Sequence, residues 1–478
     1  MKKQILISRT FGEIRIAVIE NGVLAELQVE RDSSSRISGN IYKAKVLNVI
    51  SGIKASFVDI GMEKAGIVSW KDMRSEDGTF NRREQTSPVS EGQDIIVQAV
   101  KEPVSGKGPR MKARVTLVGK YVILSTDSDK TAVSKKIGHG VERRDVGKTL
   151  EKLRPQNMGL IARTASIDKD ASLIEAEVKS LQSQWENIVQ TSHIKPSPSL
   201  LYEEPPTFLS AVRDFASPND EIIADDWDIL LEINRYIDEN FPGEPVSIGY
   251  HSSDSPLFRD FGIEQEIENL YKRKIQLRSG GDMIIEEAEG LTVIDVNTGA
   301  GTSRGGGTLL RTNLEAAAEA ARQIRLRNLV GIIVIDFIDM GFSDMKKVCK
   351  TFEDEMRKDR TSHTISEISE FCVLHLTRKR SRESVAKTLS DQCEICDGTG
   401  LVKSKETVCY EIIREIEQHN LLARGGEIRV RAHKDIIHTI KCVESELFER
   451  FERKGVSILC EEIDESIDNF TVKGEWKV

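Results

Sequence analysis

The sequence predicts a multidomain protein of mixed α/β and α+β architecture. The chain has 478 residues, of which 39% are hydrophobic, and at about 150 residues per domain roughly three modules are expected. Short strand-like runs fill the first 119 residues, and from Met283 buried strands alternate with a long helix. This alternation indicates a parallel or mixed sheet. The last stretch, 404–478, is typical of a small α+β domain with strands near 427–432 and 456–459.

The N-terminal residues predict an antiparallel sheet. Apolar and polar residues alternate in Glu13–Val18, and Asn21-Gly22 stands between two such runs, which is the strongest short-range signal of a hairpin.

Five further short apolar runs predict a small barrel such as an OB fold. They are 39–50, 54–61, 64–70, 94–100 and 113–119. Barrels of this kind often bind single-stranded nucleic acid by stacking bases on exposed aromatic rings, and Phe57 is the candidate ring. The alternative is that Phe57 belongs to the barrel core.

The region between this barrel and Met283 is expected to be richer in helix. A basic stretch, 135–144, precedes the segment GLIARTA, and a long helix is expected from about Ile167 to Gln190. The Ser- and Pro-rich loop 195–206 predicts a boundary between modules.

A glycine-rich segment, DVNTGAGTSRGGGT (295–308), poses the question of a nucleotide site. A dinucleotide fingerprint requires a third glycine where Arg304 stands, and a P-loop requires a Gly-Lys-Ser/Thr sequence that the chain lacks. The segment therefore matches neither nucleotide-binding motif.

Two apolar runs each end in an aspartate, at Asp295 and Asp336. The carboxyl ends of strands are where α/β sheets usually carry their sites. Thr312–Glu315 has the pattern of a capping box that starts a helix between the two strands, so the two aspartates are expected side by side. Paired carboxylates favour magnesium, with Asn297 as a hydrogen-bonding partner and Asp339 as a possible third ligand. The alternative is that each aspartate caps a turn.

Four segments resemble the ribonuclease E/G family: IDVNTG (294–299), the block from Thr312 to Met340, LTRKRSRES (376–384) and CEICDGTG (393–400). The resemblance extends over almost the whole chain, and the length resembles the compact G-type members. It implies an RNase H-like domain in two parts (1–37 and 206–281), into which an OB-fold RNA-binding barrel (38–118) and a 5′-sensor region (119–205) are inserted. It further implies a DNase I-like catalytic domain (282–390), a zinc link (391–400) and a small C-terminal domain (401–478).

The resemblance also implies an activity. Members are magnesium-dependent endoribonucleases that cut single-stranded, often AU-rich RNA, leave a 5′-phosphate and a 3′-hydroxyl, and process rRNA precursors and mRNA. Asp295 and Asp336 then hold magnesium with Asn297 beside them, and Arg163 with Thr164 senses a 5′-monophosphate, chemistry for which a guanidinium and a hydroxyl are suited.

Further RNA contacts follow from the same resemblance, with some departures from the family pattern. Phe57 and Lys107 match RNA-binding positions, whereas the family's second aromatic is replaced by Ile67. A basic residue and a glutamate near the active site are replaced by Ala300 and His375, and Arg304 is expected to restore the lost phosphate contact. The basic run that contains Arg378, Lys379, Arg380 and Arg382 is expected to hold the RNA backbone, although such runs are more often solvated surface.

Cys393 and Cys396 form the one C-x-x-C motif among seven cysteines. Such a pair is half of a tetrahedral zinc site, which leaves zinc shared between chains or a redox pair as alternatives. The family resemblance favours zinc that links a homodimer or homotetramer, although Glu394 replaces the usual proline. The other five cysteines are expected to be reduced structural thiols.

The formal charge of -9 argues against coating of nucleic acid by bulk charge, so any RNA site must be local. The apolar run near the start of the sequence is too short for a signal peptide, and no apolar run is long enough to span a bilayer. A cytoplasmic location is therefore expected. Two other functions stay open: a non-cleaving RNA-binding or ribosome-assembly factor, and a metal-dependent DNA nuclease or phosphatase.

Overall fold

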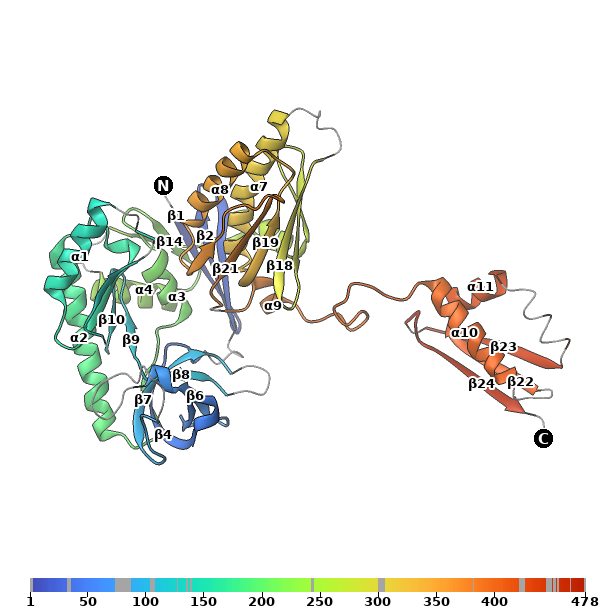
Figure 1. The fold of residues 1–478 in the computed structure, drawn as a ribbon, viewed down its shortest axis with the longest axis horizontal. Helices are drawn as coiled ribbons and strands as arrows, with labels where there is room; N and C mark the ends of the chain where they lie inside the picture. The colour runs from blue at the N-terminus through green and yellow to red at the C-terminus, as the bar shows by residue number, and fades with distance from the viewer. Residues whose placement is uncertain are drawn as a thin grey trace. The chain divides into compact units, whose positions relative to one another are not determined.

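The computed structural model divides into two compact units, Met1–Thr388 and Leu389–Val478. The residues that it describes are 3–31, 36–73, 87–103, 108–126, 128–134, 136–137, 140–241, 245–299, 306–380, 382–420, 426–443, 449, 453, 455–464 and 466–476. Figure 1 shows the chain with its elements labelled. No helix in these ranges has both the length and the apolar composition needed to cross a membrane.

The first sheet combines the N-terminus with a segment about 200 positions later in the sequence. Strands β1 (Lys3–Thr10), β2 (Glu13–Glu20) and β3 (Val23–Arg31) are antiparallel, and the expected hairpin is confirmed by positive φ at Asn21 (53°) and Gly22 (79°). Strands β14 (Glu221–Ala224) and β15 (Ser247–Tyr250) extend the sheet in parallel on the side of β1.

Helices α3 (Thr207–Phe215) and α4 (Trp227–Asn240) pack on this sheet through a shared apolar cluster. Asp226 caps α4 by accepting a hydrogen bond from the Ile229 amide at 3.0 Å. Two short helices, α5 (Leu257–Asp260) and α6 (Glu264–Glu268), follow.

The expected barrel is present and closed. Strands β4 (Ile41–Ile50), β5 (Ala55–Asp59), β6 (Gly66–Ser69), β8 (Arg110–Lys112) and β7 (Asp94–Lys101) pair in that order, and β7 returns to β4. Strand β13 (Ser199–Tyr202), from the loop expected to separate modules, also pairs with β4. The prediction of the fifth barrel strand was wrong, because β8 takes that place and the run 113–119 joins the next sheet.

The next sheet has the order β11-β12-β10-β9, with β9 at Thr116–Val118, β10 at Val122–Ser125, β11 at Thr131–Val133 and β12 at Gly159–Ala162. Helices α1 (Val141–Leu153) and α2 (Ala171–Ile194) share its apolar core. The long helix expected from about Ile167 thus begins four residues later, after Asp170.

The fourth sheet is the mixed sheet expected from the sequence. Its order is β16 (Lys274–Gln276), β17 (Asp282–Glu287), β18 (Leu291–Asn297), β19 (Gly331–Asp336), β21 (Val373–Arg378) and β20 (His363–Ile365), and only β18 and β19 are parallel neighbours. Helices α7 (Gly306–Leu326) and α8 (Phe342–Met356) bury one face of it (Figure 1). Because α7 already includes Thr312–Glu315, the predicted capping box was wrong.

The second unit is the small α+β domain that the sequence predicts. Strand β22 (Gly426–His433) lies between β23 (Val456–Ile463) and β24 (Phe470–Trp476), and α10 (Lys405–Asn420) and α11 (Lys434–Val443) pack against it. Strand β24 was not predicted. Helix α9 (Val385–Leu389) lies where the two units meet along the chain.

Candidate active site

Asp295 and Asp336 are direct neighbours across the parallel strands β18 and β19. Ile294, Val296, Ile333 and Ile335 are buried against α7 and α8. Successive side chains of a strand point to opposite faces, so both aspartates lie on the face that the two helices leave open. Asp336 is exposed and Asp295 is half-buried. The expected pairing of the two carboxylates is therefore confirmed.

The electrostatics of this pair favour a cation. Partial burial raises the pKa of the Asp336 carboxyl, and the negative charges of Asp295 and Asp339 raise it further. Among the residues that the structure describes, no lysine or arginine forms an ion pair with any of these three carboxylates. Asn297 donates a hydrogen bond from Nδ2 to Asp295 Oδ2 at 2.8 Å, as expected.

Asp339 does not join the pair as a third ligand. No group of three His, Cys, Asp or Glu side chains suited to one metal ion occurs within the described part of the chain. Two carboxylates still fit magnesium, because Mg²⁺ usually keeps several water ligands and binds few protein groups.

Asn313 positions the loop after Asp336, a role that was not predicted from the sequence. Its side chain is fully buried in α7, where Nδ2 donates to the Ile338 carbonyl at 2.8 Å and Oδ1 accepts from the Ile338 amide at 3.1 Å. The only signal was a polar Thr-Asn pair at the start of the apolar stripe of the helix. This double hydrogen bond fixes the backbone two residues beyond the catalytic candidate Asp336.

Arg378 does not occupy the expected RNA-binding position. Its side chain is 5% exposed, and its Nε and Nη2 bond both carboxylate oxygens of Asp359 at 2.8 and 3.2 Å. The remaining donors bond Asn328, Leu329 and Thr361. All five N–H groups of the guanidinium are thus used inside the protein, and the expectation of an RNA contact is wrong for this residue.

Two other candidate residues near Arg378, Arg380 and His375, are exposed. Arg380 is exposed, and its guanidinium lies over Gly331. His375 is exposed on β21, opposite Val334, and its Nδ1 is 3.0 Å from Ser366 Oγ. Lys107, Arg304 and Ala300 lie outside the residues that the structure describes.

Arg163 and Thr164 directly follow β12, an inner strand of the third sheet. Thr164 is exposed, and the Arg163 guanidinium donates to the Asp214 carboxylate at 2.7 Å and to the Gly119 carbonyl. The Arg163 backbone amide also bonds the Tyr121 carbonyl at 2.8 Å. The expected 5′-end residues are therefore held against the turn between β9 and β10.

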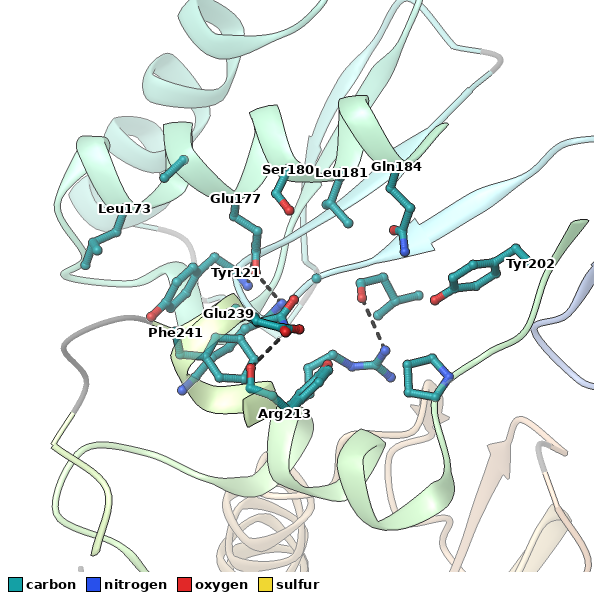
Figure 2. Close-up of a pocket in the computed structure, with 17 residues that line it drawn as sticks. Tyr121, Leu173, Glu177, Ser180, Leu181, Gln184, Tyr202, Arg213, Glu239 and Phe241 are labelled. Carbon is teal, nitrogen blue, oxygen red and sulfur yellow. Dashed lines mark hydrogen bonds between the residues drawn. The ribbon is translucent and has the colours of Figure 1, made fainter. Parts of the chain in front are cut away.

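A cavity of about 370 Å³ lies on this turn, between α2 and the end of α4. Figure 2 shows Leu173, Tyr121 and Phe241 at one end and Tyr202 and Gln184 at the other. The Glu177 carboxylate accepts hydrogen bonds from three successive backbone amides, those of Lys120, Tyr121 and Val122. Neither aspartate of the acidic pair lines this cavity, so it is separate from the candidate active site.

Phe57 lies on β5 directly opposite Ile67 on β6. Both are half-buried and neither belongs to the buried cluster inside the barrel. The alternative that Phe57 is a core residue is thus wrong, and the position of the missing second aromatic is its cross-strand neighbour.

Cys393 and Cys396 stand at the start of the second unit, and both are free thiols. The backbone amides of Cys396 and Ile395 hydrogen-bond the Cys393 thiol and hold its pKa below the usual range, with a smaller contribution from the Cys396 thiol. This arrangement stabilises a thiolate, the form in which cysteine binds metal. Of the other five cysteines, the four with described side chains are also free, and Cys442 has no described side chain.

Comparisons with known proteins agree with the resemblance. Residues 116–381 match the family described as "Ribonuclease E/G family", and residues 392–466 match "RNase E/G, Thioredoxin-like domain". The chain is 35% identical to ribonuclease G of Haemophilus influenzae (86% of this chain, 87% of that protein) and 34% identical to ribonuclease G of Escherichia coli (93% and 94%). Ribonuclease E of Haemophilus influenzae is 34% identical over 88% of this chain but only 46% of its own length. The chain therefore belongs to the ribonuclease E/G family.

Proposed function

We propose that this chain is a magnesium-dependent endoribonuclease that cuts single-stranded, AU-rich RNA and leaves a 5′-phosphate and a 3′-hydroxyl. Its family membership makes it a phosphodiester hydrolase that acts on RNA. The observation that carries the metal-dependent mechanism is the pairing of Asp295 with Asp336 on the open face of the fourth sheet. Its substrates are rRNA precursors and mRNA, with 5′-monophosphorylated RNA preferred.

Asp295 and Asp336 would hold the ion, and Asn297 would fix the orientation of the Asp295 carboxylate through its hydrogen bond. When bound, magnesium supplies charge stabilisation at the phosphoryl oxygens and a more acidic bound water. The stated products require that water attacks phosphorus and that the 3′-oxygen leaves. Asn313 keeps the backbone beyond Asp336 in place during this step.

RNA is held at several places in the first unit. The Phe57 ring stacks on a base at the barrel surface, and Arg163 with Thr164 binds the 5′-phosphate. Arg380, which is exposed, contributes to backbone binding by charge. Lys107 and Arg304 are proposed to contact RNA on the family resemblance alone.

The domain assignments follow the same proposal. Residues 1–37 and 206–281 form the RNase H-like domain, an assignment supported by the sheet that β1–β3 share with β14 and β15. The fourth sheet with α7 and α8 corresponds to the DNase I-like domain at 282–390. Cys393 and Cys396 provide half of a zinc site that links two chains.

The test is an RNA cleavage assay with an AU-rich, 5′-monophosphorylated single strand, in magnesium and then in EDTA. Asp295→Asn should abolish cleavage while leaving RNA binding nearly intact. Glu286→Gln is the matched control. Glu286 lies on β17, opposite Val293 of β18, on the same open face as the acidic pair, and it forms an ion pair with Arg273. The variant should cut at the wild-type rate.

Two results would contradict the proposal. Loss of folding in Asp295→Asn would indicate a structural aspartate. RNA binding by the wild type without any cuts would support a non-cleaving assembly factor, for which the departures at Ile67, Ala300 and His375 are the only grounds.

A further inference from the structure

One carboxylate oxygen joins the 5′-end arginine to a second, buried arginine. Asp214 Oδ1, on α3, accepts a hydrogen bond from Arg163 Nη2 at 2.7 Å and another from Arg213 Nε at 3.2 Å. Arg213 is buried, and its Nη1 donates to Glu204 Oε1 at 3.1 Å and to the Val118 carbonyl at 3.2 Å. Arg213 also lines the cavity beside the 119–121 turn (Figure 2).

The two neighbouring guanidiniums favour the charged form of Asp214. Burial alone would raise its pKa, but the neighbouring guanidiniums of Arg213 and Arg163 lower it to about 2. The side chains of Arg163 and Asp214 are 20% and 28% exposed, which shields their ion pair from solvent more than a surface pair. Phe215 follows Asp214 in the sequence, and the Arg360 guanidinium packs over its ring, 4.7 Å from the ring centroid.

The contacts fix the Arg163 guanidinium in one orientation. Nη2 bonds Asp214, Nη1 bonds the Gly119 carbonyl, and the backbone amide bonds Tyr121. A guanidinium has five N–H donors in a planar fork, and within the described ranges of the chain the other three have no hydrogen-bond partner and can bind a ligand beside the exposed Thr164. A phosphate needs such a fork at a fixed angle to be bound bidentately.

We propose that Asp214 is a positioning residue that sets the preference for a 5′-monophosphate by orienting Arg163. The inference rests on the 5′-end binding proposed above and assigns it a residue that the sequence motif did not include. Asp214 itself does not contact the RNA, since a carboxylate would repel the phosphate.

Because Asp214 is charged, its two possible roles predict opposite effects of Asp214→Asn on the preference for a 5′-phosphate. Replacing the carboxylate by an amide makes the pocket more positive by one charge. If Asp214 acted only through its charge, Asp214→Asn would increase the affinity for a 5′-phosphate. If it orients Arg163, the variant loses the preference instead.

Glu204→Gln is the matched control. It also removes one carboxylate from buried Arg213, but among the described residues Glu204 forms no ion pair or hydrogen bond with Arg163. Any general effect of removing a carboxylate partner of Arg213 should therefore occur in both variants. Loss of the Arg163 orientation should occur only in Asp214→Asn.

The experiment measures kcat/KM for one RNA oligonucleotide with a 5′-monophosphate or a 5′-hydroxyl, in the full chain with magnesium. Asp214→Asn should reduce the ratio of the two by about tenfold, the effect of one charge-assisted hydrogen bond. Glu204→Gln should keep the wild-type ratio, and Asp214→Glu should restore part of it. Melting temperatures are recorded for each variant, and Asp214→Glu carries the test if Asp214→Asn does not fold.

An unchanged or increased ratio in Asp214→Asn, or an equal loss in Glu204→Gln, would overturn the positioning role. Arg163→Gln separates this failure from failure of the proposed 5′-end site. If Arg163→Gln slows both RNAs equally, or the wild type has no preference, the 5′-end site itself is wrong and the inference is rejected with it.

Discussion

At the scale of single residues, identical side chains in one short run lie in opposite environments. Arg378 and Arg380 are two positions apart, and the sequence treats both as part of one basic run. Arg378 is the last residue of β21 and lies on its buried face, where it forms an ion pair with Asp359, whereas Arg380 is beyond the strand and exposed. Burial depends on strand phase and on where the strand ends, which a run of charges does not reveal.

These two arginines give a matched pair of variants. Arg378→Ala should lower the free energy of unfolding by about 3–5 kcal/mol, because it leaves the Asp359 charge buried without its partner. Arg380→Ala should change stability by less than about 0.5 kcal/mol, but weaken RNA binding and reduce its salt dependence. Urea denaturation and RNA binding at several salt concentrations check both. Wild-type stability in Arg378→Ala would refute the structural role.

The contribution of the Arg378–Asp359 ion pair to stability should depend on pH. Burial would raise the pKa of Asp359, but hydrogen bonds from His363 and Arg378, with the charge of Arg378, hold it well below its usual range. A carboxyl with a lowered pKa in the folded state stabilises the protein above its unfolded pKa of about 4, and this contribution is lost as pH falls through the lowered value. The difference between wild type and Arg378→Ala should therefore shrink on acidification.

At the scale of elements, the sequence predicts strands better than it predicts their partners. The runs that become β4, β5, β6 and β7 alternate clearly, but β8 has only three residues and two of them are basic. The stronger run at 113–119 was assigned to the barrel in its place, although β9 pairs with β10 in another sheet. Likewise, the capping-box pattern at Thr312 lies inside α7, where the Thr312 hydroxyl donates to the Thr308 carbonyl of the same helix and buried Asn313 bonds Ile338.

The pairing of β5 with β6 predicts how base stacking can be changed. Phe57→Leu should weaken binding of single-stranded RNA by about 1–3 kcal/mol, the usual value of one stacked base. Ile67→Phe should strengthen it, because it places a second ring directly opposite the first. Phe11→Leu is the control, as Phe11 is an exposed aromatic in the turn between β1 and β2, outside the barrel. Fluorescence anisotropy measures the affinities, and equal effects at Phe11 and Phe57 would count against stacking.

At the scale of the whole molecule, the individual barrel, mixed sheet and C-terminal unit were more predictable than the pairing of strands far apart in the sequence. The apolar runs that end in aspartate predicted the acidic pair, and the family resemblance indicated the proposed 5′-end residues and the role of the cysteine pair. Pattern alone did not indicate that β14 and β15, each of four residues, pair with β1 about 200 positions earlier. Asp214 was missed for the same reason, since its partner Arg163 lies 51 positions earlier and reaches α3 only in the folded chain. Long-range contacts leave little trace in a single sequence.

The cysteine pair predicts how whole chains assemble. One chain offers two thiolates, and a structural zinc needs four ligands, so a shared site requires about half a zinc per chain. Cys393→Ser should lose zinc and become monomeric, whereas Cys460→Ser should keep both zinc and assembly, because Cys460 lies on β23 within the second unit's own sheet. Metal analysis and light scattering after size exclusion measure both. A wild-type dimer that survives removal of zinc by a chelator would show that other contacts join the chains.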